Sequence, residues 1–96
     1  MSDDRTHARR LLVEGRVQGV GFRAWLEDEA RAHGLDGWVR NRRDGTVEAV
    51  LAGAPARVDA VVQRCHAGPA LARVSAVRTT PVDEPVEPGF RQRSTV

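Results

Sequence analysis

The most constraining stretch of this chain, residues 15–23, carries three glycines within seven residues. It lies between an apolar run at 11–13, which predicts a strand, and a helical pattern that begins near Phe22. Because glycine has no Cβ, such a loop can turn its backbone N–H groups inward, and the N-terminus of the helix adds further unpaired N–H groups. Arg23 falls in the first helical turn, where a cation is unfavourable unless an anion lies close by. The stretch therefore predicts an anion-binding loop.

The size and composition of the chain predict one globular domain. Its 96 residues suffice for a single modest core, and its apolar and charged contents are ordinary. No apolar run approaches the ~20 residues that a membrane span needs, so we expect no membrane partner. The first eight residues are polar, with no apolar signal region, which predicts a flexible N-terminal tail over residues 1–8 and a cytoplasmic protein.

All 15 basic residues are arginine, and this narrows the possible chemistry. Without lysine the chain can form neither a Schiff base nor the lysine contact of a P-loop. Because arginine keeps its proton, these cations can bind and orient a substrate but cannot act as bases. The net charge of +2 is too small for a dedicated nucleic-acid binder, so we expect no nucleic-acid partner.

The remaining pattern alternates strands and helices. The first helix ends at Gly34, an Asp-Gly pair at residues 44–45 predicts a hairpin turn, and Pro55 opens the second helix. Strands are expected at 9–17, 37–41, 46–52 and 71–80, with an irregular alternation in the last that allows a bulge, and residues 90–96 can add a short edge strand.

This order, βαββαβ, predicts a ferredoxin-like α+β sandwich. Two helices with one apolar stripe each must cover one face of a four-stranded antiparallel sheet. We expect a single domain over residues 9–96. The fold hosts many unrelated activities, so the function has to be argued from the site.

Two segments resemble the signatures of one family. Residues 13–23, VEGRVQGVGFR, are similar to the N-terminal signature of the acylphosphatases, and residues 37–47, GWVRNRRDGTV, with Gly53 six residues on, resemble their second signature. The resemblance covers about residues 9–94. It implies a small enzyme that hydrolyses acyl phosphates without metal or cofactor, as a free-standing monomer, with inorganic phosphate as product and competitive inhibitor.

The resemblance also implies roles for individual residues. Arg23 matches the arginine that holds the phosphoryl group, and Asn41 matches the asparagine that positions the attacking water. Gly21 precedes Phe22 where some members carry an aromatic residue, so we expect a more flexible loop tip. The phosphate cradle corresponds to the backbone of Gly15, Arg16, Val17, Gln18, Gly19 and Val20.

The chemistry of the residues points the same way. An acyl phosphate releases a carboxylate, whose conjugate acid has a pKa of roughly 4, so no general acid is needed. A phosphate monoester releases an alkoxide and needs a general acid or a metal. Neither segment offers a set of acids or a metal-ligand spacing, and neither contains Cys, Ser or His as a nucleophile. A site without these groups favours an activated phosphate as substrate. It also predicts that no covalent intermediate forms on the enzyme.

The sequence alone leaves two roles open for each of several side chains. Gln18 is either a brace for the loop or a solvated side chain, and Arg42 and Arg43 are either a solvated turn or guides for an incoming dianion. Phe22 and Trp38 are expected to pack in the core or against the site. The lone cysteine, at position 65, is expected to be a buried hydrophobe, and the histidines at 7, 33 and 66 are expected on the surface.

Other functions share the predicted fold. RNA-recognition modules place aromatic residues on the first and third strands, and neither strand has one here. A non-catalytic module that binds phosphate with the same loop is a second alternative. A third is the acylphosphatase-like domain at the front of larger carbamoyl-transferring maturation proteins.

Overall fold

The computed structural model describes residues 7–96 and confirms the ferredoxin-like α+β fold. No helix in this part of the chain is long and apolar enough to cross a bilayer. The seven elements are β1 (His7–Arg16), α1 (Phe22–Ala32), β2 (Asp36–Asn41), β3 (Val47–Gly53), α2 (Pro55–Cys65), β4 (Arg73–Pro81) and β5 (Phe90–Gln92).

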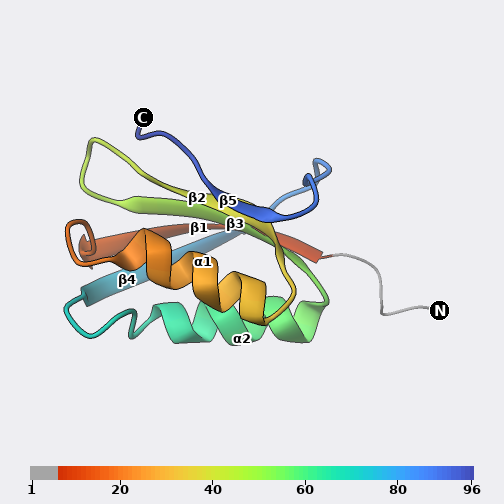
Figure 1. The fold of residues 1–96 in the computed structure, drawn as a ribbon, viewed down its shortest axis with the longest axis horizontal. Coiled ribbons are helices and arrows are strands. Elements are labelled where there is room, and N and C mark those ends of the chain that lie inside the picture. The colour runs from red at the N-terminus through yellow and green to blue at the C-terminus, as the bar shows by residue number, and fades with distance from the viewer. Residues whose placement is uncertain (1–6) are drawn as a thin grey trace.

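The strands form one sheet in the order β4-β1-β3-β2-β5, with both helices on the same face (Figure 1). β1 and β3 are the central antiparallel pair, and β2 flanks β3. The fifth edge strand exists and runs parallel to β2. The first strand begins earlier than expected, because His7 and Ala8 pair with the end of β3. The predicted tail is therefore wrong for these two residues, and the rest of it lies outside the described residues.

The core lies between the helices and the sheet. The apolar residues that the strand and helix periodicities predicted to share one face are fully or almost fully buried, except Val62 of the α2 stripe, which is partly buried and packs against the core. Cys65 is one of them, and burial, followed by the nearby Glu29 charge, raises the pKa of its thiol to about 12. It is therefore an inert core residue, as expected. The predicted set found in the core is Leu11, Val13, Phe22, Leu26, Ala30, Val47, Ala49, Leu51, Val58, Val61 and Cys65.

A bulge in β4 sets the position of the loop after β1. Glu14 pairs with Ala76 but Gly15 pairs with Val74, so Ser75 is the extra residue. Gly15 has φ +119°, and a Cβ there would stand 2.2 Å from the carbonyl oxygen of Arg73. Only glycine allows the two strands to approach this closely where β1 ends.

The position of Trp38 differs from the prediction that it packs in the core or against the site. It lies on the face of the sheet that carries no helix, partly exposed, and belongs neither to the core nor to the wall of the loop cavity. The guanidinium carbons of Arg40 and Arg93 stand 4.7 and 4.5 Å from its ring centroid. Because β2 alternates, the buried Val39 takes the core face and leaves Trp38 on the other, where cation–π contacts cover it.

Glu48 is the buried charge of this helix-free face. Its side chain is 5% exposed. Burial alone would raise the pKa of Glu48, but hydrogen bonds from three arginines outweigh burial and hold the pKa below its ordinary value of 4.5. The prediction of Arg42 as a solvated turn is wrong, because Arg42 is one of these partners, whereas Arg43 is exposed. The three donors are Arg40 at 2.8 Å, Arg10 at 2.6 Å and Arg42 at 3.1 Å.

We expect Glu48→Gln to lower the free energy of unfolding by about 2 kcal/mol at pH 7, because it leaves partly buried arginines without their counter-ion. The folded-state pKa of Glu48 is depressed, so its stabilisation is present above pH 4.5 and is lost as the pH falls through the folded value. Urea unfolding of both proteins should therefore show a difference that shrinks between pH 7 and pH 3.

The control is Glu87→Gln, because Glu87 is 76% exposed and stands 3.5 Å from Arg91. It should change stability by less than about 0.5 kcal/mol. Equal effects of the two substitutions would contradict the account of Glu48.

Candidate active site

The loop between β1 and α1 presents backbone N–H groups without acceptors. Gly19 and Gly21 have φ of +74° and +80°, and Gly21 caps α1 by accepting a hydrogen bond from the N–H of Trp25 at 3.0 Å. No side chain caps this helix, and its first turn contains no acidic residue. Within the described residues, the N–H groups of residues 18–24 have no hydrogen-bond acceptor. Loop and helix terminus together therefore offer an anion a set of free donors.

Gln18 fixes this loop to the opposite hairpin. Its Nε2 donates to the carbonyl oxygens of Arg42 at 2.7 Å and Thr46 at 2.8 Å. These carbonyls belong to the turn between β2 and β3, directly after Asn41. The interpretation of Gln18 as a brace is therefore confirmed, and the brace sets the distance between the loop and the end of β2.

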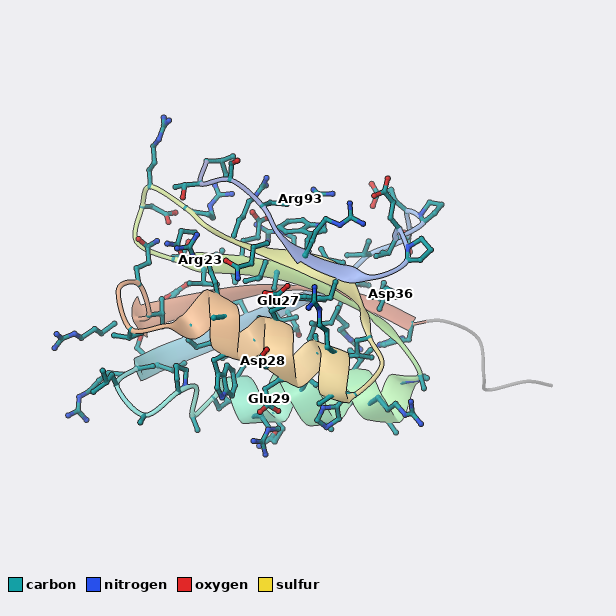
Figure 2. All side chains as sticks on the ribbon, viewed as in Figure 1. Arg23, Glu27, Asp28, Glu29, Asp36 and Arg93 are labelled. Carbon is teal, nitrogen blue, oxygen red and sulfur yellow. The ribbon has the colours of Figure 1, made fainter. Side chains whose placement is uncertain are left out.

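Arg23 and Asn41 line the same cavity, which has a volume of about 150 Å³. Arg23 comes from the first turn of α1 and Asn41 from the last residue of β2. Figure 2 shows Arg23 and, one turn later, Glu27 on the same side of α1, toward β2 and the C-terminal segment. The backbone of Asn41 is held by its pairing with Val47 and by a 3.3 Å hydrogen bond from the N–H of Val96. Neither side chain has a hydrogen-bond partner among the described residues, so both remain available to a ligand.

The predicted cradle is only partly found at this cavity. Val17, Gln18 and Gly19 line it, and so does Gly21. Gly15 and Arg16 instead belong to β1, where they pair with Val74 and Arg73. The side chain of Val20 packs against the core. The part of the cradle that faces the cavity is therefore 17–19, continued by Gly21 and the first turn of α1.

Sequence reasoning missed Gln92, the last residue of β5, which also lines the cavity. Its place depends on the parallel pairing of β5 with β2, in which Gln92 lies opposite Val39. A three-residue edge strand has no period to detect, so nothing in the sequence signalled this contact. Phe22 and Ala24 complete the lining, as expected for residues at the start of α1.

The electrostatics of the cavity favour an anion. Arg23 is the one charged side chain among the described residues that line it. Glu27, four residues later on α1, could neutralise Arg23, but its carboxylate binds Arg31 at 2.8 Å and Gln92 at 2.9 Å. The residues that line the cavity therefore combine a helix N-terminus, free N–H groups and a cation without a counter-ion. These features are those of an anion-binding site on an α+β sandwich fold.

Comparison with known proteins identifies the family. The acylphosphatase family model matches residues 9–92. An acylphosphatase 2 of Ralstonia nicotianae is 59% identical over 87 residues, which cover 90% of this chain and 92% of the relative. An acylphosphatase of Azorhizobium caulinodans is 49% identical over 92 residues, covering 95% and 99%. The chain belongs to the acylphosphatase family, which comprises hydrolases that act on acyl phosphates.

The solved structures agree with the sequence comparison. The structure of an acylphosphatase from Coxiella burnetii superposes with a TM-score of 0.90 at 30% sequence identity, covering 97% of this chain and 100% of that one. The resemblance stated from the two signatures is therefore confirmed at the levels of family and fold.

Proposed function

We propose that the chain hydrolyses small acyl phosphates to a carboxylate and inorganic phosphate by direct attack of a water molecule on phosphorus. The observation that carries this proposal is the meeting of Arg23, Asn41 and the free N–H groups of the loop in one small cavity. Inorganic phosphate would be both product and competitive inhibitor. The proposed setting is the cytoplasm and the proposed form a monomer, with no nucleic-acid or membrane partner.

In this proposal the loop and Arg23 hold the phosphoryl group. The N–H groups of residues 18 and 19 and those at the start of α1 donate to its oxygens, and the Arg23 guanidinium offers a planar pair of donors to the same group. Phosphoryl transfer spreads negative charge over the equatorial oxygens, so fixed donors around them stabilise the transition state. A cavity of about 150 Å³ admits the phosphoryl group and leaves much of the acyl group outside.

Asn41 would position the attacking water. Its side chain is an amide, which accepts or donates a hydrogen bond but does not take up a proton near neutral pH. The water therefore has to attack without a general base, which suits a loose transition state with little bond formation to the nucleophile. Because the water is held in line with the scissile bond, its bimolecular attack becomes an effectively unimolecular step within the bound complex.

The lack of a general acid in the described lining limits the proposed substrate class. A carboxylate departs unprotonated because its conjugate acid has a pKa of roughly 4, whereas an alkoxide does not. The buried Cys65 thiol, with its pKa raised to about 12, lies on α2 outside the cavity and offers no thiolate nucleophile. Activated phosphates are therefore the substrates that this site suits.

We expect the purified protein to hydrolyse benzoyl phosphate at an unchanged rate when a chelator is present and to leave p-nitrophenyl phosphate intact. The reason is that only the first substrate has a leaving group that needs neither a proton nor a metal. Absorbance assays of both substrates, with and without chelator, provide the measurement. A protein that ignores benzoyl phosphate, or needs a metal for it, would contradict the proposal.

Arg23→Ala and Asn41→Ala should separate binding from catalysis. Arg23→Ala should lower kcat/KM for benzoyl phosphate by about a thousandfold and weaken competitive inhibition by inorganic phosphate, because it removes the phosphoryl ligand. Asn41→Ala should lower kcat by about a hundredfold while phosphate still inhibits, because the cradle remains intact. Steady-state kinetics with phosphate as inhibitor gives both quantities.

The matched control is Arg57→Ala, which removes an exposed arginine of α2 far from the cavity lining. It should leave both constants within about twofold. Near-normal turnover by the Asn41→Ala protein would show that Asn41 does not place the water.

A further inference from the structure

We infer that Gln92 is a second residue that orients the attacking water, and that Glu27 sets the direction of its amide. This inference rests on the proposed function, because it concerns the same water that Asn41 places. It begins from the position of Gln92 at the cavity. Gln92 lies opposite Val39 in the parallel pair of β5 and β2, and Asn41 lies two residues beyond Val39. Since strand residues alternate between faces, Gln92 and Asn41 project from the same face of the sheet.

The hydrogen bond to Glu27 fixes which end of the amide is free. Nε2 of Gln92 stands 2.9 Å from Oε1 of Glu27. Because a carboxylate can only accept, Gln92 must present its NH₂ group to Glu27 and keep its Oε1 for another partner. The amide direction is thus set by chemistry, and the free end is an acceptor.

Glu27 itself is held in place from two sides. Arg31, one turn later on α1, binds its Oε2 at 2.8 Å and donates to the carbonyl oxygen of Phe90 in β5 at 3.0 Å. Figure 2 shows Glu27 on the same side of α1 as Arg23. These contacts fix Glu27 against β5, where it orients Gln92 and stays out of an ion pair with Arg23.

Two acceptors complete the orientation of a nucleophilic water. A water molecule has two O–H donors, and its lone pair attacks phosphorus only when both donors point elsewhere. Asn41 can accept a hydrogen bond from one O–H through its Oδ1, which leaves the water free to rotate about that hydrogen bond. A hydrogen bond from the second O–H to Oε1 of Gln92 stops this rotation and turns a lone pair towards phosphorus. No proton is transferred to Gln92 or Asn41: the P–O bond to the carboxylate breaks as the water oxygen bonds to phosphorus, one water proton stays on the inorganic phosphate, and the other is released to solvent.

The test compares Gln92→Met, which keeps the length of the side chain and removes its acceptor, with the matched control Gln63→Met on an exposed position of α2. Loss of one hydrogen bond to the nucleophile should lower kcat for benzoyl phosphate about tenfold. The KM and the inhibition constant of inorganic phosphate should stay within about twofold, as should every constant of the control. Thermal unfolding confirms that each variant is folded.

Two further variants distinguish orientation from structure. Glu27→Gln lets the Gln92 amide turn either way, so kcat should fall by about threefold, and the double variant with Gln92→Met should lose no more than Gln92→Met alone. In an Asn41→Ala background, Gln92→Met should cost less than a further twofold or so, because both residues act on one water.

The outcomes separate the two claims. A Gln92→Met protein with normal kcat, beside an Asn41→Ala protein that is impaired, overturns the role of Gln92 and leaves the proposed function intact. A full tenfold loss in the Asn41→Ala background shows an independent effect and also overturns it. If Gln92→Met does not fold, a normal kcat for Glu27→Gln overturns the orientation by Glu27. Near-normal turnover by the Asn41→Ala protein removes the water-positioning role of Asn41 and this inference with it, whereas only a failure of the unmodified protein to hydrolyse benzoyl phosphate removes the proposed function.

Discussion

The backbone N–H groups at the start of α1 are the constraint on which the site depends. A helix leaves its first N–H groups without partners, and most helices satisfy them with a capping side chain. Here Gly21 supplies no side chain, and the glycine loop before it adds N–H groups that find no acceptor in the described part of the chain. Arg23 adds a cation to the positive end of the helix dipole. An anion satisfies all of these groups at once, so the local structure favours a negatively charged ligand.

Strand pairing in the sheet places Asn41 beside this anion site. The pairing of β1 with β3, and of β3 with β2, brings the loop after β1 next to the end of β2. Gln18 then joins the loop to the β2–β3 turn through two carbonyl oxygens. Asn41, directly before this turn, is thereby held at a fixed distance from the loop. In the proposed mechanism, the phosphoryl group is bound by one local segment, whereas placement of the water depends on strand pairing.

The sequence predicted those parts of the molecule that depend on local pattern. Leu11, Val13 and the stripe of α2 show a strong period, and Asp44-Gly45 is a local turn signal, so the elements and their order could be read directly. The two signatures located Arg23 and Asn41, which the structure brings to one cavity. That they perform the predicted roles stays a prediction.

Contacts across the sheet escaped prediction. Arg42 is part of the Glu48 cluster because β1, β2 and β3 lie side by side, and Trp38 faces away from the helices because Val39 takes the core side. Gln92 reaches the cavity through a short parallel strand with no pattern of its own. Each of these positions is set by strand register, which a single sequence specifies only through its buried face.

The central claim is that water attacks phosphorus and that the carboxylate leaves with its oxygen atoms intact. Hydrolysis of benzoyl phosphate by the protein in water enriched in oxygen-18 tests this claim directly, with mass spectrometry of both products. The account predicts that the label enters inorganic phosphate and that benzoate stays unlabelled. Label in benzoate would show attack at the carbonyl carbon and would contradict the mechanism built on the glycine loop, Arg23 and Asn41.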